Sequence, residues 1–484
     1  MASNHTVFWC NPLIGDARET QEFGNNDVIR LVTSNDPFLS ILNLGMSDHS
    51  IGHIDATIQA LLENQSVRHV NLILDDFSDS QIENLAIALC NKKITVDVVS
   101  STSDTFIHFF RCLHQYLSQP ISSIAICHQF ENLLCIKSVA HFLEFHNTNL
   151  TFTFCKDSSK LPSPALNFIL DALVSSNNSL QGLTINGSLN CNEIKTLCHA
   201  LKYFQSLSEL EIVASNGEAF CHLVEFCEGN TSLINLDIGV DGNLALAQID
   251  RFSVNLPLAF PSLERFSMRN LILNNLDGIS EDLYPTSESW LTGIRLKDFT
   301  LSIIYGDEHS TSLFLSHLSH VFQKVERLEL EIDEIKVDFS KHFTYNANLH
   351  SLQLSTNYGT PTNFASLLQE LPVFPKIEQL ILRDYVIKSQ QMARDMRVEE
   401  QILQCVKKMS KLRHIILPSG NTHSRNERVE NEIYFECMLR TLNQKRLWEA
   451  PLALLPRILG KLVEGRWFNL VYFIICKRND VIIK

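Results

Sequence analysis

A short apolar phrase recurs about every 28 residues along most of this chain, and a period of that length constrains the fold more than any other feature. Each copy has an apolar residue, two variable residues, an apolar residue, one variable residue and a third apolar residue. The clearest copies begin at Leu39, Val67, Ile121, Leu180, Leu207, Leu233, Leu263, Leu291, Val325, Leu349, Ile377 and Leu412. Weaker copies near Ile94 and Leu150 bring the total to about fourteen units. The period predicts similar units stacked around one continuous core.

Between the phrases, the apolar spacing changes to that of a helix. Residues that share one helical face are Ile54, Ile58, Leu61 and Leu62; Phe106, Phe109, Phe110, Leu113 and Leu117; Leu166, Ile169, Leu170 and Leu173; and Ile402, Cys405, Val406 and Met409. Parallel strands need such a crossover between them, and a right-handed one is strongly preferred. The sequence therefore predicts an α/β protein in which each strand is followed by a helix. Wider spacings near 150–180, 296–325 and 382–412 indicate insertions.

These residues resemble the leucine-rich repeat family, and within it the ribonuclease-inhibitor-like class, in which short strands alternate with full helices. The junctions that such repeats use are visible as Asn178-Ser179-Leu180, Asn230-Thr231-Ser232-Leu233 and Asn346-Ala347-Asn348-Leu349. The resemblance implies an α/β solenoid, or horseshoe, with a concave parallel β-sheet and outer helices over residues 37–420. With 484 residues and no Pro/Gly/Ser-rich linker, the chain suits one elongated domain of this kind.

One position departs from the family pattern. Three residues after the last apolar anchor, such repeats usually carry a small polar side chain that hydrogen-bonds the turn. Here that position holds Ser47, Cys155, Ser188, Ser215 and Asn357, with Asp75, Asp241 and Asp333 as substitutes, but also Val99, Leu271, Phe299, Tyr385 and Gly420. Some turns are therefore expected to be irregular.

The two ends differ from the repeats. Residues 1–36 contain no phrase and are predicted to form an N-terminal cap over the first unit. Residues 421–484 are predicted to form a polar loop and a helical cap, with Pro456 in the first turn of an apolar helix. This segment is similar to the one that follows the repeats in leucine-rich repeat proteins of unicellular algae. A basic docking or membrane-surface helix is the alternative interpretation.

Charge and cysteine content bear on partners and compartment. The net charge of −14 argues against nucleic acid as the main partner, since phosphate binding needs a basic surface. The thirteen cysteines show no paired spacing, and no apolar leader stands at the N-terminus. No apolar run reaches the length of a membrane span. A cytoplasmic protein without stable membrane insertion is the simplest expectation.

The sequence shows no enzyme signature, so we expect no catalysis, no cofactor and no metal. His317 and His320 have the nearest metal-like spacing, but they lie on an apolar helix without a third ligand nearby. We interpret them as ordinary helix histidines. Cys127 and His128 are adjacent on a strand and so point to opposite faces, which is poor geometry for a thiol and its base.

Function is therefore expected on the inner face of the sheet. In each phrase, the residues that flank the middle anchor and the residue after the last anchor point away from the core. At these positions the sequence places Glu209, Glu211 and Asp237, then Arg265, Arg269, Arg295, Lys297 and Arg327, and then Glu329 and Glu331. A basic band between two acidic ones is predicted. These charges either pair across strands, which contributes little, or mark a site for an acidic partner.

The resulting hypothesis is a protein-binding scaffold or adaptor that holds a protein partner on the concave surface. Two alternatives stay open. One group of GTPase-activating proteins shares this repeat type, although no arginine here can be given its catalytic role and the acidic tail of that group is absent. A substrate receptor of a ubiquitin ligase is disfavoured, because residues 1–36 lack the Leu-Pro-rich helical character of an F-box.

Overall fold

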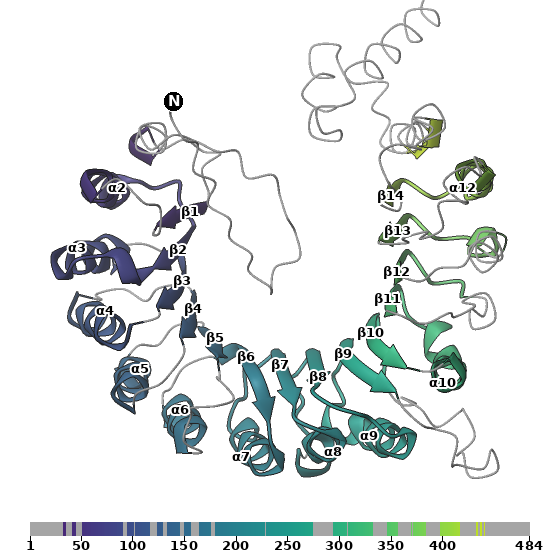
Figure 1. The fold of residues 1–484 in the computed structure, drawn as a ribbon, viewed down its shortest axis with the longest axis horizontal. Helices are drawn as coiled ribbons and strands as arrows, with labels where there is room; N and C mark the ends of the chain where they lie inside the picture. The colour runs from purple at the N-terminus through teal and green to yellow at the C-terminus, as the bar shows by residue number, and fades with distance from the viewer. Residues whose placement is uncertain are drawn as a thin grey trace, which may run out of the picture. The chain divides into compact units, whose positions relative to one another are not determined.

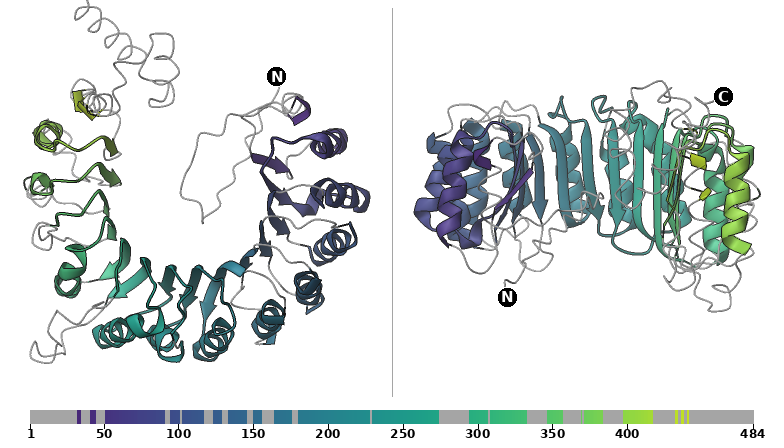
Figure 2. Two further views of the ribbon diagram at one scale, coloured as in Figure 1. Left: turned by 180° about the vertical axis from the view of Figure 1, so that it is seen from behind. Right: turned by 90° about the horizontal axis from the view of Figure 1, so that it is seen from above.

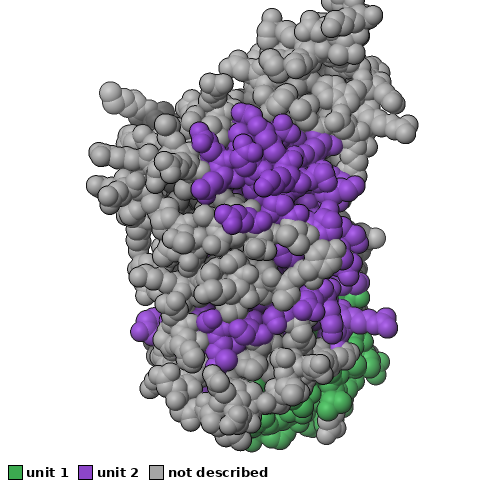
Figure 3. Space-filling model, turned by 90° about the vertical axis from the view of Figure 1, so that its right-hand side faces the viewer, with its two compact units in different colours: residues 1–243, 247–264 green, residues 244–246, 265–484 purple. Residues whose placement is uncertain are grey.

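The computed structural model of the 484-residue chain shows strands and helices in strict alternation over much of its length (Figures 1 and 2). The residues that it describes are 32–34, 41–44, 51–90, 94–100, 102–116, 123–128, 133–145, 150–155, 164–175, 180–227, 229–273, 294–306, 308–332, 346–356, 369, 371–383, 397–416, 432, 433, 436, 437 and 440. The chain forms two compact units (Figure 3). Unit 1 comprises residues 1–243 and 247–264, and unit 2 comprises residues 244–246 and 265–484.

Unit 1 contains two runs of parallel strands. Its strands are β1 (Ile41–Leu44), β2 (His69–Ile73), β3 (Thr95–Ser100), β4 (Ser123–His128), β5 (Leu150–Cys155), β6 (Leu180–Leu189), β7 (Glu209–Ala214) and β8 (Asn235–Val240). The helices between them are α2 (Ile51–Glu63), the 3-10 helix η1 (Leu74–Asp76), α3 (Asp79–Cys90), α4 (Ser103–Tyr116), α5 (Leu133–Phe145), α6 (Pro164–Ser175), α7 (Cys191–Leu201) and α8 (Gly217–Phe226), followed by α9 (Leu246–Ala259). Strands β1 to β4 form one sheet in chain order, and β5 to β8 follow in a second sheet, also in chain order.

Unit 2 repeats this plan with longer first strands. Its strands are β9 (Arg265–Leu273), β10 (Asp298–Gly306), β11 (Arg327–Ile332), β12 (Ser351–Thr356), β13 (Gln379–Arg383) and β14 (His414–Ile416). Its described helices are α10 (Glu308–Phe322), the 3-10 helix η5 (Leu371–Val373) and α12 (Arg397–Lys408). Neighbouring strands pair in parallel and in chain order from β9 to β14.

In each unit the helices lie along one side of the strands (Figure 1), and burial alternates along the strands to match. The register sets the middle apolar positions of neighbouring phrases opposite one another: Val70, Val96 and Ile124; Leu183, Leu210 and Leu236; and Leu328, Leu352, Leu380 and Ile415. The expectation of an α/β protein with parallel strands and crossover helices is confirmed in these residues.

One phrase was placed wrongly. The copy predicted to begin at Leu291 would make Ile294 its middle position, but Phe299 is the residue paired with Phe266 and Leu328. The phrase of this unit is therefore displaced by five residues along the chain, from a middle position at 294 to one at 299. The displacement moves two predicted site residues off the strand, as described below.

Most described members of the helix faces predicted from the sequence are buried; Ile54 is half-buried, and Leu117 lies outside the described residues. Fully or almost fully buried members are Ile58, Leu61, Phe106, Phe109, Phe110, Leu113, Leu166, Ile169, Leu170, Leu173, Ile402, Cys405, Val406 and Met409. Leu62 is 41% exposed, because it lies at the edge of the apolar stripe of α2. Aromatic rings also join helices of successive repeats. Phe220 of α8 stacks on Phe252 of α9, with the ring centroids 3.9 Å apart. Such contacts pack neighbouring helices against each other.

An asparagine side chain joins each of three repeats to the repeat before it; two of these asparagines, Asn64 and Asn346, are buried and the third, Asn230, is half-buried. Asn346 is 1% exposed and its Nδ2 donates to the carbonyl oxygens of Phe322 and Val325 at 2.6 and 2.7 Å. Its Oδ1 accepts from the backbone N–H of Asn348 at 2.7 Å. The carbonyl of Phe322 is at the end of α10, where backbone oxygens lack a partner within the helix. Two further side chains act in this way, with Nδ2 of Asn64 donating to Val32 and Nδ2 of Asn230 donating to Leu201.

After α12, an arginine takes the place of the asparagine. Arg440 donates to the carbonyl oxygens of Val406 and Met409 at 2.8 and 2.7 Å, and to that of Leu412 at 3.3 Å. The carbonyl groups of Met409 and Leu412 occupy the same positions in their repeat as those of Phe322 and Val325, which Asn346 contacts, occupy in an earlier repeat. Arg440 therefore satisfies the end of α12 from beyond β14, which is the last strand among the described residues.

Most of the predicted N-terminal cap (1–36) and most of the predicted C-terminal loop and helical cap (421–484) lie outside the described residues. This includes the helix predicted after Pro456. Their boundaries stay predictions.

Replacement of Asn346 by alanine should destabilise unit 2. The substitution leaves two buried carbonyl oxygens and one N–H without their partner, a loss of about 1 to 3 kcal/mol. Urea unfolding followed by circular dichroism should show a lower midpoint. Asn348→Ala is the matched control, because the side chain of Asn348 is exposed and its removal should change the unfolding free energy by less than about 0.5 kcal/mol. Equal effects of the two substitutions would show that the buried contacts are unimportant.

Replacement of Arg440 by methionine keeps an apolar stem but removes every hydrogen-bond donor. We expect faster amide hydrogen exchange in the last turn of α12 and in β14, measured by mass spectrometry, with little change in unit 1. Lys408→Met serves as control, since Lys408 is exposed on the same helix. Unchanged exchange in the Arg440 variant would mean that the end of the array needs no such cap.

Candidate protein-binding face

Side chains on either side of the buried middle position of each strand point away from the helices, because side chains alternate along a strand. We call the surface that they form the helix-distal face. In unit 2, the residues that precede the middle position are Arg265, Asp298, Arg327, Ser351, Gln379 and His414. Those that follow it are Ser267, Thr300, Glu329, Gln353, Ile381 and Ile416. The register thus gathers side chains from distant parts of the sequence into two rows.

Asp298 on β10 lies between two arginines of the first row. Arg265 is its register partner on β9, and Arg327 is its register partner on β11. Arg265 Nε is 3.8 Å and Arg327 Nη1 is 3.6 Å from the same carboxylate oxygen, Asp298 Oδ2. The two arginine side chains are 53% and 72% exposed. Both separations are longer than a hydrogen bond, so these ion pairs should add little to stability.

Arg295 and Lys297 do not lie where the sequence predicted. Because the phrase is displaced by five residues, both stand before β10 instead of flanking its middle position. Lys297 occupies the same position in its unit as Glu326 in the next, since the N–H of Glu326 donates to the carbonyl oxygen of Lys297. The predicted stack of like charges on β9, β10 and β11 is therefore wrong: Asp298 interrupts it.

The remaining predicted residues of unit 2 lie on β9 and β11. Arg269 is half-buried near the middle of β9, and Glu329 is half-buried on β11, where it accepts a hydrogen bond from Gln353 of β12. Glu331 is exposed on the same strand. None of the five predicted basic residues is buried, so all five can be reached by a partner. The surface is one of mixed charge instead of a basic band.

The predicted acidic residues of unit 1 do come together. Glu211 of β7 is the register partner of Asp237 of β8, and Glu209 lies two residues before Glu211. Thr184 of β6 donates to Glu211 Oε2 at 3.4 Å. Carboxylates directly opposite each other on neighbouring strands repel. Glu209 is exposed and the other two are half-buried, so this part of the face is open to solvent and acidic.

A histidine and an aspartate on β2 and β3 form a polar cluster that the sequence reading missed. His69 Nε2 is 2.9 Å from Asp97 Oδ2 and 2.6 Å from Asn71 Oδ1. The side chain of Asp97 is only 11% exposed, and that of His69 is 25% exposed. The hydrogen bond to Asp97 raises the pKa of His69 above its usual 6.5, against the lowering effect of burial. The available signal was positional, because both residues flank middle positions of adjacent phrases.

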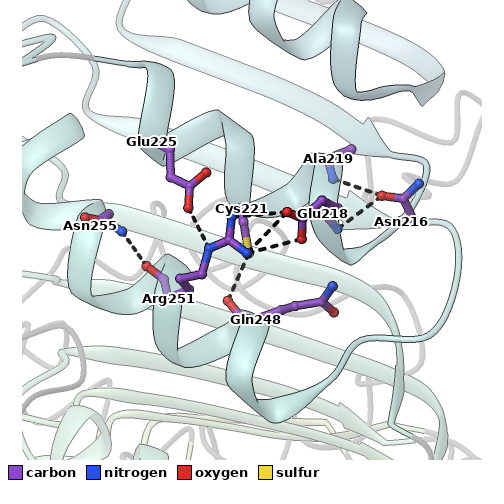
Figure 4. Close-up of polar contacts among 8 residues, drawn as sticks. All are labelled: Asn216, Glu218, Ala219, Cys221, Glu225, Gln248, Arg251 and Asn255. Atoms are coloured by element: carbon purple, nitrogen blue, oxygen red, sulfur yellow. Dashed lines mark hydrogen bonds and ion pairs between the residues drawn. The ribbon is translucent and has the colours of Figure 1, made fainter.

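The helix side of unit 1 carries a different charged cluster (Figure 4). Arg251 of α9 donates through Nε to Glu225 at 2.6 Å and through Nη1 and Nη2 to Glu218 at 3.2 to 3.3 Å. These contacts tie α9 to α8, and the hydrogen bonds from Arg251 lower the pKa of the Glu218 carboxyl. Cys221 Sγ donates to the carbonyl oxygen of Gln248 at 3.2 Å in the same region. Arg251, Glu218 and Glu225 are paired between helices, which is a structural role.

Two pairs of residues in the sequence have a spacing that could have suggested chemistry. His317 and His320 lie within α10, and Cys127 and His128 end β4, but these four side chains lie outside those described. Among the described residues, no group of three or more His, Cys, Asp or Glu could hold a metal ion. The described cysteines are free thiols, and burial raises the pKa of Cys90, Cys221 and Cys405 to about 12. These thiols are protonated near neutral pH and so are poor nucleophiles.

No family model matches the chain, and no curated protein matches it. In the described part of the chain, none of the helices combines the length and the apolar character needed to cross a membrane.

The His69 and Asp97 pair predicts a pH dependence of stability. The folded-state pKa of His69 is raised, so the protonated form is favoured in the folded state, and its stabilisation is fully present below about pH 6.5. It should be lost as the pH rises through the folded-state pKa. The urea midpoint of the wild type should therefore fall between pH 6 and pH 8 by more than that of Asp97→Asn. If both proteins showed the same pH profile, the pair would have no thermodynamic role.

Proposed function

We propose that the chain is a leucine-rich repeat protein whose units form a horseshoe solenoid, and that it is a scaffold or adaptor which binds a protein partner on its helix-distal face. Three features support the fold. Middle apolar positions of successive units pair in register, crossover helices lie on one side of the parallel strands, and junction asparagines such as Asn346 bond to the preceding unit. Each unit thus packs mainly on its neighbours, as in a solenoid.

The observation that carries the proposed function is the first row of unit 2, in which every residue from Arg265 to His414 is polar or charged. Arg265 and Arg327 are more than half exposed. The strand register places them on β9 and β11, one on each side of β10. Their ion pairs with Asp298 are too long and too exposed to be needed for folding. Regularly spaced polar side chains on a rigid sheet provide positioned contacts for a protein surface, and arginine is enriched where such contacts contribute most.

A cytoplasmic location is part of the proposal. The described cysteines are free, and nearly all of them are buried within the repeats, which suits a reducing compartment. We propose a non-enzymatic role, since binding through rows of side chains requires no bound cofactor.

Charge reversal at Arg265 and Arg327 should reduce partner capture. We would express full-length wild type and the double variant R265E/R327E in the native cell, capture each protein by an affinity tag and identify co-purifying proteins by mass spectrometry. Specific partners should drop by about tenfold or more, because reversing two interface charges replaces attraction with repulsion. The thermal midpoint of both proteins should be compared first to establish that the variant is folded.

The matched control is K408E/K411E, which makes the same change in net charge at two exposed lysines of unit 2 away from the face. The control should retain the partners of the wild type. Equal losses in both variants would point to non-specific electrostatics, and equal retention in both would remove this face as the binding site.

A further inference from the structure

The two arginines that flank Asp298 have hydrogen-bond donors to spare. Their interactions with described residues are the two long ion pairs to Asp298 Oδ2, at 3.8 and 3.6 Å. A guanidinium group carries five N–H donors in a planar fork. At these separations and exposures, water satisfies those donors, and a better acceptor could replace it.

The register holds the two guanidinium groups on opposite sides of one carboxylate. Arg265 and Arg327 lie on the strands that flank β10, so their backbones are separated by two strand spacings, about 10 Å. Asp298 contributes one negative charge against their two positive charges, which leaves the group of three with one positive charge. One further anion would make it neutral.

Asp298 already shows what kind of ligand the two arginines accept. Its carboxylate contacts both of them through a single oxygen, while its side chain remains 24% exposed. A second oxyanion that approached from solvent could receive the N–H groups that Asp298 leaves unused. Arginine matches the planar carboxylate and the phosphate group with paired hydrogen bonds, whereas lysine acts as a point charge.

We propose that Arg265 and Arg327 form an oxyanion-binding site for an acidic side chain of the protein partner, and that Asp298 is an internal competitor which weakens this binding. The inference rests on the proposed function of the helix-distal face. The acidic group is a carboxylate or a phosphate on a peptide segment, since both offer paired oxygen acceptors. Nucleic acid fits poorly, because a phosphate backbone is bound by a wide basic surface that contacts several phosphates, whereas this site offers two arginines on a chain with a net charge of −14.

The position of Asp298 gives the inference its distinctive consequence. The Asp298 carboxylate repels an incoming anion and interacts with both guanidinium groups itself, and both effects oppose binding. Removal of its charge with retention of its shape, as in Asp298→Asn, should therefore strengthen the binding of anionic peptides, whereas removal of either arginine should weaken it.

The test uses fluorescence anisotropy with the full-length protein at low salt. The probes are a labelled oligoglutamate peptide, a labelled peptide of the same length with a phosphoserine in an uncharged sequence, and a labelled oligoglutamine peptide. The protein variants are wild type, D298N, R265A/R327A and the control K408A/K411A. The thermal midpoint of each variant is measured alongside, so that loss of folding is not mistaken for loss of binding.

We expect wild type to bind at least one anionic probe and not oligoglutamine. R265A/R327A should bind that probe about tenfold more weakly or worse, and D298N roughly two- to fivefold more tightly. K408A/K411A should bind like wild type. Preference for oligoglutamate or for the phosphoserine peptide then identifies the acidic group as carboxylate or phosphate.

Three results would overturn the inference: no binding of either anionic probe, the same loss in K408A/K411A as in R265A/R327A, or weaker binding by D298N. None of these three results contradicts the proposed function. If R265E/R327E loses its cellular partners while no anionic peptide binds, the face binds protein through other contacts. If R265E/R327E retains its partners, the face itself has been assigned wrongly.

Discussion

The hydrogen-bond ladder at the start of the strands is the constraint on which the arrangement of side chains depends. In unit 2, the N–H of Glu326 donates to the carbonyl oxygen of Lys297, that of His350 to Glu326, and that of Glu378 to His350. In unit 1 the same step runs from Ser208 to Gln181 and from Ile234 to Ser208. Each repeat is therefore bonded to the next at an equivalent residue, so the same strand register holds from one repeat to the next. A one-residue slip would turn every strand side chain to the other face, which the buried anchors forbid.

Most of this register could be predicted from the sequence, because burial imposes a periodic apolar pattern that is visible in one dimension. The failure near residue 294 has a specific cause. Leu296 belongs to two overlapping phrases, one with Ile294 before it and one with Phe299 and Leu301 after it, and both satisfy the apolar spacing. Phe299 and Leu301 are essentially fully buried, at 1% and 0% exposure, against 7% for Ile294. The choice depends on backbone pairing with the adjacent units, which apolar spacing alone does not contain.

Contacts between side chains of different repeats were harder to predict than the apolar anchors. The hydrogen bond from His69 to Asp97 spans 28 residues, and the bonds from Arg440 to the end of α12 span 28 to 34. Such contacts arise only when two units are placed side by side in the correct register. The first pair could have been found by aligning the phrases around Val70 and Val96. Arg440 could not, because it follows the last phrase and has no periodic pattern to place it.

The residues that stabilise unit 2 and those of the proposed recognition face occupy different positions in their repeats. Asn346 is buried and bonded to the carbonyl oxygen of Phe322, at the end of α10, and to that of Val325, so its loss should be costly. Arg265 and Arg327 are exposed and joined to Asp298 by long ion pairs, which contribute little to folding. The fold therefore tolerates a change in charge on the helix-distal face far better than a change in the core. This difference would allow the register to carry the proposed binding site, because the anchors fix where each exposed side chain stands while its chemical identity can change without loss of the core.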